Sequence, residues 1–405
     1  MKIALLTNEY PPNVYGGAGV HVEYLTRELA KLDDGAHEIN VFSFGDQRED
    51  HGNVTVHGVQ PIGDAPATDE RHVKFLQTLQ RDIVMAGLVD DADVVHCHTW
   101  YSHFGGCLVK QLAGAKLVLT THSLEPHRPW KVEQLGTAYH GSSWIERTAY
   151  ENADGVVAVS NAMADDVCDL YDVDPGRVRT IYNGIDLDQY QPRPNEDVLR
   201  QHGVDPDTPI VLFVGRITRQ KGILHLVNAL QYLEGDVQVV LLAGAPDTEE
   251  IEQEMTDRVE RARETSDANI TWIAEMLPKD EVIAFYSHAD VFVCPSVYEP
   301  FGIINLEAMA CETPVVASAV GGIPEIVVPG ETGLLVEFDA VGGGDADPAD
   351  PAQFSHDLAD AVNELLADPA RRDRMAQASR ERVEKVFSWT AIAEQTLDFY
   401  QSLTD

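Results

Sequence analysis

The stretch YEPFGIINLEAMA, residues 298–310, predicts a loop that leads into a helix with two acidic side chains on one side. Behind Gly302 the apolar residues recur with the spacing of a half-buried helix: Ile303, Ile304, Leu306 and Met309. Glu299 then precedes the helix, and Glu307 falls in its second turn. Because their spacing advances a helix by about two turns, the two carboxylates can face the same way.

The start of this helix is predicted to bind an anion. The amides of Gly302, Ile303 and Ile304 belong to its first turn, where N–H groups lack partners within the helix and the dipole is positive. An anion at these amides and neutral hydroxyl groups at two carboxylates would suit a nucleotide sugar. Two acids in so acidic a chain can equally form a solvated helix face, so the rest of the sequence has to decide.

The chain has 405 residues, enough for two domains, and a formal net charge of −38 from 67 acidic and 29 basic residues. This charge disfavours nucleic acid and anionic lipid as partners. It is spread along periodic apolar segments, and we interpret it as an adaptation to a high-salt, halophilic cytoplasm. No apolar run is long enough to predict a transmembrane segment, and MKIALLTNEYPP is too short in its apolar part for a signal peptide. A cytoplasmic enzyme is expected.

The first half of the chain alternates short apolar runs with amphipathic stretches, which predicts a doubly wound parallel sheet. The expected strands are Ile3–Thr7, Glu38–Phe44, Val94–His96, Leu117–Thr120 and Gly155–Val159. The expected helices are Gly19–Lys31, Asp69–Leu88 and Ser142–Asn152. The polar, proline-containing segment Tyr190–Gly203 is interpreted as a linker.

A second alternating set follows this linker and predicts a second domain of the same class. Its expected strands are Ile210–Gly215, Val237–Ala243, Asn269–Ile273, Val291–Cys294 and Pro314–Ala317. The glycine- and aspartate-rich segment Val341–Pro351 is predicted to be a surface loop, and Trp389–Leu403 a helix. Ligands in such sheets bind at the carboxyl ends of strands, where the polar motifs fall.

Two further motifs favour phosphate binding. NEYPPNVYGGAGVHVEYLTREL (8–29) follows the first strand, and Gly16 and Gly17 allow a close approach of the backbone to an anion. VGRITRQKG (214–222) follows the first strand of the second half, and its Arg216 and Lys221 could balance a diphosphate leaving group. The Asp-x-Asp triplets at 91–93, 172–174 and 345–347 stand apart from these motifs, so no metal site is predicted.

Taken together, these strings resemble the retaining GT-B glycosyltransferases of family 4. The resemblance implies two Rossmann-like, doubly wound parallel-sheet domains that face each other across a cleft. It also implies that Glu299 contacts the donor sugar, that Glu307 holds the nucleotide ribose, and that the Phe301–Gly302 turn belongs to the nucleotide-sugar site. NGID (183–186) and GGIPEIVVPGETGLLV (321–336) match the same family. No cofactor is implied besides the donor substrate.

Three stretches resemble the first-domain region of bacterial and archaeal glycogen synthases: HCHTWYSHFGG (96–106), THSLEPHRPWKVEQLG (121–136) and SSWIER (142–147). The resemblance implies that His122 lies near the reacting sugar. Because the donor groups belong to the second domain, we expect the acceptor to bind on the first domain, at a cluster of Arg128, Trp130, Lys131 and Glu133. The three histidines of the first stretch lack acidic partners and are interpreted as cleft and core residues.

The resemblance therefore implies an N-terminal acceptor-side domain (1–188), a C-terminal nucleotide-sugar domain (204–385), and a final helix (386–405) that returns to the N-terminal domain. The expected activity is a metal-independent, retaining transfer of glucose from ADP- or UDP-glucose to an α-1,4-glucan, as in glycogen synthases. Alternatives are a maltose 1-phosphate synthase with glucose 1-phosphate as acceptor, another family 4 transferase, and, from a different class, a sugar-nucleotide 2-epimerase. The loop Ala274–Pro278 carries no distinctive code for the base.

Overall fold

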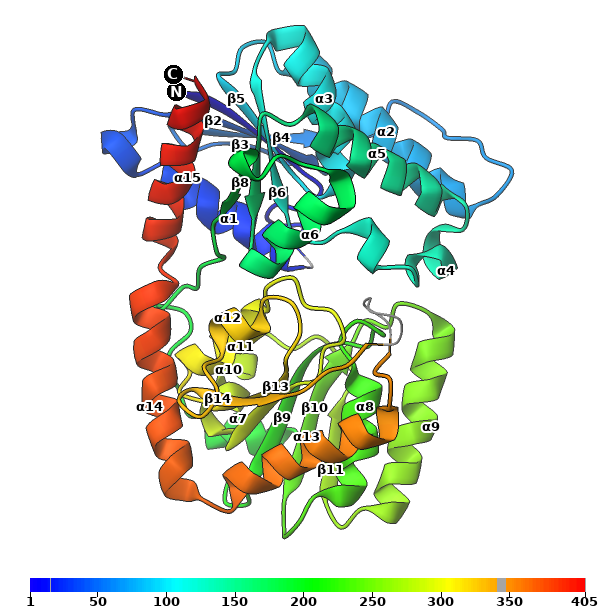
Figure 1. Ribbon diagram of the computed structural model, residues 1–405, viewed down its shortest axis with the longest axis vertical. Helices are drawn as coiled ribbons and strands as arrows, with labels where there is room; N and C mark the ends of the chain where they lie inside the picture. The colour runs from blue at the N-terminus through cyan, green and yellow to red at the C-terminus, as the bar shows by residue number, and fades with distance from the viewer. Residues whose placement is uncertain (15, 341–346, 405) are drawn as a thin grey trace. The chain divides into compact units, whose positions relative to one another are not determined.

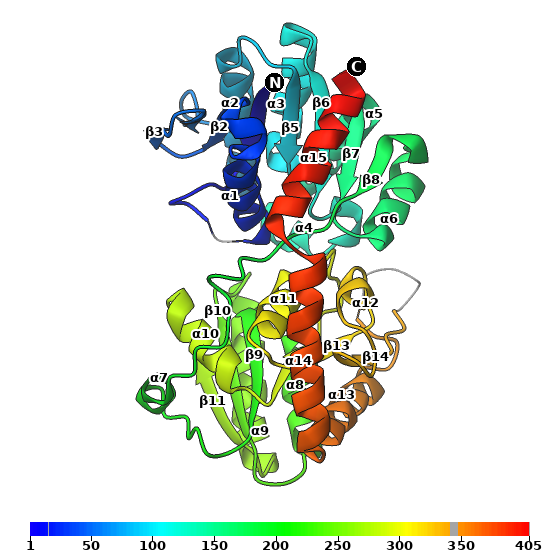
Figure 2. The ribbon, with the colours of Figure 1, turned by 90° about the vertical axis from the view of Figure 1, so that its left-hand side faces the viewer.

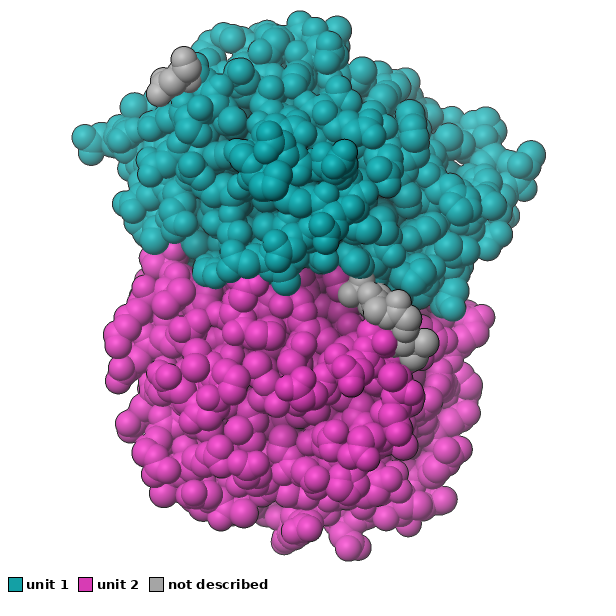
Figure 3. Space-filling model, viewed as in Figure 1, with its two compact units in different colours: residues 1–184, 389–405 teal, residues 185–388 magenta. Residues whose placement is uncertain are grey.

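The computed structural model describes residues 1–14, 16–340 and 347–404. It divides into two units, coloured separately in Figure 3. Unit 1 comprises Met1–Gly184 and Trp389–Asp405, and unit 2 comprises Ile185–Ser388. Each unit contains a parallel sheet with helices packed on it.

Unit 1 is built on an eight-stranded sheet in the order β3-β4-β2-β1-β5-β6-β7-β8, in which β3 alone is antiparallel to its neighbour. The strands are β1 (Lys2–Thr7), β2 (Glu38–Phe44), β3 (Arg48–Asp50), β4 (Val54–Val59), β5 (Val94–His98), β6 (Lys116–Thr121), β7 (Gly155–Ala158) and β8 (Val178–Thr180). All residues of β5 and β7 are buried, since helices cover both faces of the sheet; β7 (GVVA) is apolar throughout, whereas β5 (VVHCH) also buries His96 and His98.

The helices of unit 1 cover the two faces of this sheet (Figure 1). They are α1 (Gly17–Leu29), η1 (Leu32–Gly35), α2 (Arg71–Leu88), α3 (Trp100–Ala113), η2 (Glu125–His127), α4 (Lys131–Leu135), α5 (Ala138–Asn152), α6 (Asn161–Tyr171), η3 (Pro175–Arg177) and α15 (Trp389–Thr404). Helix α15 packs against α1, and Figure 2 shows it running across one face of the sheet. Its Ile392, Leu397 and Tyr400 belong to the same apolar core as Ile3 and Leu25. Helices α2, α3 and α5 contact one another on the other face.

Unit 2 is built on a six-stranded, fully parallel sheet in the order β11-β10-β9-β12-β13-β14. Its strands are β9 (Ile210–Arg216), β10 (Gln238–Gly244), β11 (Asn269–Ile273), β12 (Val291–Cys294), β13 (Val315–Ser318) and β14 (Gly333–Val336). Its helices are α7 (Glu196–Gln201), α8 (Ile223–Ala229), η4 (Leu230–Tyr232), α9 (Glu249–Thr265), α10 (Lys279–His288), α11 (Ile303–Ala310), α12 (Ile323–Ile326), α13 (Pro351–Leu366) and α14 (Pro369–Val386). Side chains from α8, α9 and α13 form one core with β9, β10 and β12.

The chain passes between the units at two points, and two aromatic residues mark the second one. Phe387 is buried in unit 2, where its ring lies 5.9 Å from that of Phe301. Trp389 is buried in unit 1, stacked on Tyr24 at 5.4 Å between ring centroids. The returning segment therefore begins at Trp389, three positions later than the expected start at residue 386, because Phe387 anchors the end of α14 to unit 2.

The predicted strands agree with the observed ones except at their ends, and β2, β11 and β12 have the predicted bounds. The predicted linker Tyr190–Gly203 is instead part of unit 2 and contains α7. The glycine-rich loop prediction falls partly on residues 341–346, which lie outside the described residues; beyond them, Asp350 caps α13 by accepting hydrogen bonds from the amides of Ala352 and Gln353. Of the helices in the described ranges, none combines the length and apolarity needed to span a bilayer.

Candidate active site

Unit 2 contains an ion pair between Lys221 and the buried Glu299. Lys221 follows β9 and Glu299 follows β12, so both lie beyond the carboxyl ends of neighbouring strands. The Lys221 Nζ donates to Glu299 Oε2 at 2.6 Å, and the Ser296 hydroxyl donates to the same oxygen at 3.2 Å. The two predicted catalytic side chains of different motifs are therefore in direct contact.

The protonation state of Lys221 follows from this pair. Burial lowers the pKa of Lys221, but the charge of Glu299 and the hydrogen bond to it outweigh burial, so the pKa lies above its usual value. The lysine is thus held as a cation. Glu299 is 6% exposed, so its carboxylate depends on Lys221 and Ser296 for stabilisation.

Two glycines fix the backbone around this ion pair. A Cβ atom at Gly321 would lie 2.1 Å from the carbonyl oxygen of Glu299, and one at Gly222 would lie 1.9 Å from that of Pro295. Both glycines have positive φ, at +52° and +60°. The amide of Gly322 donates to the Glu299 carbonyl at 3.0 Å, so the Glu299 peptide is held on two sides.

The start of α11 has the geometry expected for an anion site. Gly302 has a φ of 108° and turns the chain into the helix, and a Cβ there would meet the Asn305 side chain. The backbone N–H of Asn305 donates to the Gly302 carbonyl at 2.9 Å, and this hydrogen bond forms the first turn of the helix. The amides of Gly302, Ile303 and Ile304 occupy the positions that lack intrahelical acceptors in any helix.

Glu307 lies in the second turn of α11, as predicted, but it is held by two tyrosines that the sequence did not indicate. Tyr286 of α10 donates to Glu307 Oε2 at 3.0 Å, and Tyr190 of the supposed linker donates a second hydrogen bond. Burial raises the pKa of Glu307, and the hydrogen bonds from Tyr190 and Tyr286 oppose that rise. Glu307 is therefore a positioned acceptor for a hydroxyl group.

Arg216, at the end of β9, pairs with Asp247. The distance from the guanidinium to Asp247 Oδ1 is 3.1 Å, and the side chain is 38% exposed. It therefore keeps contact with solvent while one acid sets its direction.

In unit 1 the glycine-rich loop meets a carboxylate. The amide of Gly16 donates to Glu9 Oε2 at 2.8 Å, so this predicted anion contact is occupied by an acid of the chain itself. Gly17 is exposed at the start of α1. A Cβ at Gly19 would lie 2.8 Å from the Glu9 Cβ, which explains why a glycine follows the loop at that position.

His122, after β6, is half-buried among other imidazoles. Its Nε2 lies 3.0 Å from Nδ1 of His98, and its ring lies 4.9 Å from that of His21. His21 Nδ1 is 2.6 Å from Asn183 Oδ1, which fixes the ring. Burial, with the neighbouring histidines, holds the pKa of His122 and His98 well below the usual value, so both are neutral.

One ligand atom from each of His21, His98 and His122 lies within 4.8 Å of the others, a spacing compatible with a metal ion. The histidines considered in the sequence analysis were a different set, His96, His98 and His103, and they were not predicted to bind a metal. His96 is engaged by Tyr400 at 2.5 Å and by Thr120 at 2.6 Å, in agreement with a core role.

The expected acceptor cluster on unit 1 requires a correction at Lys131. This residue is 6% exposed, and its Nζ lies 3.3 Å from Glu125 Oε1. Burial and the charge of Arg128 lower the pKa of Lys131 to about 8 despite Glu125. Lys131 therefore points inward and stabilises a buried acid, because helix α4 turns this side chain toward the protein interior.

The rest of that cluster divides between core and surface. Arg128 donates to the Ser123 hydroxyl at 3.2 Å and its side chain is 18% exposed; Trp130 is half-buried and Glu133 is exposed. Beneath them, Glu146 accepts a hydrogen bond from the Glu125 amide at 2.8 Å. Burial and the charge of Glu125 raise the pKa of Glu146 to about 8. The cluster thus rests on a buried polar network.

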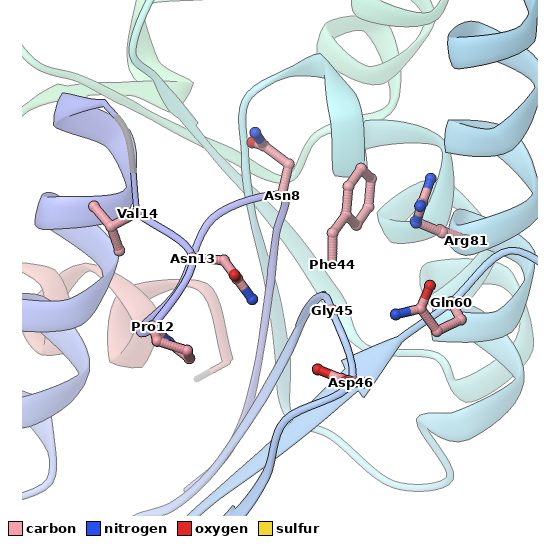
Figure 4. A pocket seen from close by; sticks show the side chains of 9 residues that line it. All are labelled: Asn8, Pro12, Asn13, Val14, Phe44, Gly45, Asp46, Gln60 and Arg81. Atoms are coloured by element: carbon pink, nitrogen blue, oxygen red, sulfur yellow. The ribbon is translucent and has the colours of Figure 1, made fainter.

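Two adjoining cavities open at the carboxyl edge of the unit 1 sheet, and the sequence did not predict them. They have volumes of about 530 and about 270 Å³ and share the lining residues Asn8, Phe44 and Arg81. Figure 4 shows Arg81 of α2 beside the ring of Phe44, which ends β2, and Asn8, which follows β1. The smaller cavity is also lined by Lys74, Phe75, Gln77, Thr78, Trp100, Tyr101 and Leu135. The volume of the larger cavity lies in the range of small-molecule sites, the smaller one lies just below it, and ligands of such sheets bind at this edge.

Two parallel-sheet units with polar groups at their strand ends agree with the GT-B class of glycosyltransferases, and the comparisons place the chain there. The chain superposes on sucrose-phosphate synthase from Thermosynechococcus elongatus with a TM-score of 0.76 and 27% identity, covering 99% of this chain and 98% of that one. Residues 15–189 match the model described as Glycosyltransferase Family 4, and residues 194–342 match Glycosyl transferases group 1. The chain belongs to family 4 of the glycosyltransferases.

Two curated relatives differ in their degree of similarity. The chain is 48% identical over 408 residues to alpha-maltose-1-phosphate synthase of Mycolicibacterium smegmatis, with 100% of both chains covered. It is 30% identical over 428 residues to glycogen synthase of Mycobacterium tuberculosis, covering 99% of this chain and 94% of the relative. The comparison thus favours the alternative acceptor of the sequence analysis over the main expectation.

Proposed function

We propose that the protein transfers a glucosyl group from a nucleoside diphosphate glucose to glucose 1-phosphate, with retention of configuration, and so forms maltose 1-phosphate. The bond from the glucose C1 to the diphosphate oxygen breaks, and a bond from C1 to an acceptor hydroxyl oxygen forms. The acceptor proton leaves with the nucleoside diphosphate. The observation that carries this proposal is the 48% identity, over both full lengths, to an alpha-maltose-1-phosphate synthase.

The donor is assigned to unit 2. Lys221 and Arg216 would stabilise the charge that develops on the departing diphosphate, and preorganised cations are worth most where charge appears during the reaction. The amides at the start of α11 would hold the phosphate oxygens. Glu299, once engaged by sugar hydroxyl groups, would orient the ring, and Glu307 would accept from the ribose. The 2.6 Å contact between Lys221 and Glu299 supports a shared role in one site.

Retention would need no protein nucleophile. The leaving phosphate can take the proton from the incoming hydroxyl on the same face of the sugar. His122, neutral because of its buried neighbours, can donate or accept a hydrogen bond to a sugar hydroxyl without adding a charge. No metal is required by this scheme, and a chelator such as EDTA should leave turnover unchanged.

A second candidate is elongation of an α-glucan, which the 30% identity to a glycogen synthase supports. The decisive experiment is a matrix of ADP-, UDP- and GDP-glucose against glucose 1-phosphate, maltodextrin and no acceptor. Formation of an α-linked disaccharide phosphate, identified by NMR, is expected. Transfer to maltodextrin alone would overturn the proposal in favour of the second candidate, and nucleotide release with an epimerised sugar and no acceptor would reveal an epimerase.

A further inference from the structure

The smaller cavity of unit 1 is lined by two cations and, among the described residues, by no acid. Its two charged lining residues are Lys74 and Arg81, both of α2, in a chain with 67 acidic and 29 basic residues. Three other cations of unit 1 do have acidic partners: Lys2 with Asp91, Arg71 with Asp69, and Lys110 with Asp154. Among the described residues, no carboxylate lies within 4.0 Å of Lys74 or Arg81. In so acidic a surface, such a pair favours an anionic ligand.

Arg81 is oriented toward the cavities rather than free in solvent. Its guanidinium carbon lies 4.7 Å from the centre of the Phe44 ring, and its Nε is buried without a hydrogen-bond partner among the described residues. Burial alone lowers the pKa of Arg81, which agrees with the lack of a nearby acid, and the group stays charged. An arginine fixed in this way presents its remaining N–H groups as a planar fork, which matches the oxygens of a phosphate.

The lining of the smaller cavity also contains aromatic residues. Trp100 and Tyr101, at the start of α3, lie with ring centroids 4.2 Å apart, and Phe75 lies 6.0 Å from Trp100. The Trp100 Nε1 is a second buried donor that lacks a partner among the described residues. An amphipathic ligand, with a flat face for these rings and an anion for Arg81, would fit this lining.

The larger cavity continues from Arg81 and is mostly uncharged. Its amide side chains, those of Asn8, Asn13 and Gln60, offer both donors and acceptors of the kind that sugar hydroxyls need. Asp46 is the one acid of this lining. The two cavities together therefore provide a cationic end that suits an anion and an amide-lined end that suits hydroxyl groups.

We propose that Arg81 and Lys74 bind the phosphate of a sugar 1-phosphate acceptor in the smaller cavity of unit 1, with Trp100 and Tyr101 beside the sugar. This inference rests on the proposed function, since it assigns the acceptor phosphate of that reaction. It replaces the expected role of Lys131, whose charge is already used by Glu125.

The test measures acceptor and donor kinetics for Arg81→Gln, Lys74→Gln and a control, Lys116→Gln. Lys116 is an exposed cation of the same unit at the amino end of β6, outside both cavities. Arg81→Gln should raise the KM for glucose 1-phosphate about 10–100-fold, the scale of a charge-assisted hydrogen bond, and leave the KM for the donor unchanged. Lys74→Gln should act in the same direction by a few-fold because it is exposed. Arg81→Lys should restore part of the affinity.

Direct binding separates this inference from the proposed function. Titration calorimetry without donor should show binding of glucose 1-phosphate that inorganic phosphate competes away and that Arg81→Gln loses, while thermal midpoints confirm folding. If glucose 1-phosphate is a substrate but Arg81→Gln behaves like Lys116→Gln, the site assignment is wrong and the function stands. If it is no substrate, yet wild type binds it and Arg81→Gln does not, the anion site stands and the function falls. Equal binding by both proteins overturns the site.

Discussion

The polar groups of the two units are arranged in opposite ways. In unit 2 each functional cation already has an acid: Lys221 contacts Glu299 at 2.6 Å, and Arg216 contacts Asp247 at 3.1 Å. In unit 1 the cations that line the smaller cavity, Lys74 and Arg81, have none among the described residues. The charges of the Lys221 and Arg216 sites are thus balanced before any ligand arrives, and those of the smaller cavity are not.

This difference teaches what each site is suited to stabilise. Charged side chains that are already paired and held in place can stabilise a charge that develops during the reaction, because these side chains need not reorganise in the transition state. An unbalanced pair of cations suits charge that arrives with a ligand and remains on it. The contrast therefore supports the two proposals made above: the leaving diphosphate of the donor at unit 2, and the permanently charged acceptor at unit 1.

The largest effect that could break this contrast is expected at Lys221. Lys221→Ala should lower turnover about 10²–10³-fold, the scale for loss of one preorganised donor. Because it also leaves Glu299 buried without its cation, the free energy of unfolding should fall by about 3–5 kcal/mol. The control is Arg219→Ala, an exposed cation of the same loop that pairs with Glu254 at 3.7 Å. Near-normal turnover of Lys221→Ala would show that this lysine does not stabilise the leaving diphosphate.

A smaller loss is expected at Gly321, which tests the rigidity of the unit 2 site. Gly321→Ala should lower turnover about 10–100-fold, since its Cβ would displace the Glu299 peptide, and small misplacements near the chemistry are costly. Gly330→Ala is the matched control: its φ is also positive, at +78°, but a Cβ there meets nothing within 4 Å. The control should lose about 1–2 kcal/mol of stability and keep its turnover. Equal turnover of the two variants would show that the Glu299 backbone tolerates displacement.

The buried network of unit 1 should produce a pH dependence of stability. The pKa of Glu146 rises from 4.5 to about 8 on folding, so its contribution is complete below pH 4.5 and is lost as the pH rises through about 8. The thermal midpoint should therefore decline between about pH 5 and pH 8, and Glu146→Gln should flatten that decline. Glu133→Gln, which removes an exposed acid of the same region, should leave the slope as it is. An unchanged slope in Glu146→Gln would locate the titration elsewhere.

The smallest effect for each charged side chain is expected from salt, which should change the thermal stability of both units. The net charge of −38 implies self-repulsion, and ions screen it, so the thermal midpoint should rise with KCl between dilute buffer and molar concentration. Calorimetry over that range measures it. A midpoint that stays flat would show that the halophilic interpretation is wrong. The KM for a phosphorylated acceptor should rise over the same range, since Lys74 is exposed, whereas the Lys221–Glu299 contact is shielded.

The local geometry around α11 could be predicted from the sequence because it belongs to one continuous string, whereas the roles of its residues stay predictions. Glu299, Gly302 and Glu307 lie within one loop and helix, and the helical spacing of the apolar residues fixes their relation. The strands were predictable for a similar reason, since buried parallel strands are continuous apolar runs. Tyr190 was missed because its segment is polar and short of apolar periodicity, although its side chain bonds to Glu307.

The cavities of unit 1 could not be predicted because six separate segments build them. The lining residues come together only when the ends of β1, β2 and β4 and the helices α2, α3 and α4 are assembled; one residue from each is Asn8, Phe44, Gln60, Arg81, Trp100 and Leu135. The prediction that Lys131 lies on the surface was wrong for a related reason. A lysine next to a tryptophan in a polar stretch is typical of an exposed cluster. Its burial depends on Glu125 and on the direction in which α4 turns it.

The position of α15 has a consequence for biosynthesis. Unit 2 is one continuous segment, Ile185–Ser388, and its whole core is available as soon as that segment leaves the ribosome. Unit 1 is begun first but lacks Ile392, Leu397 and Tyr400 of its core until α15 emerges. Unit 1 is therefore synthesised first but completes its folding last. The apolar surface of α1 that α15 covers stays exposed to solvent while residues 185–388 are translated.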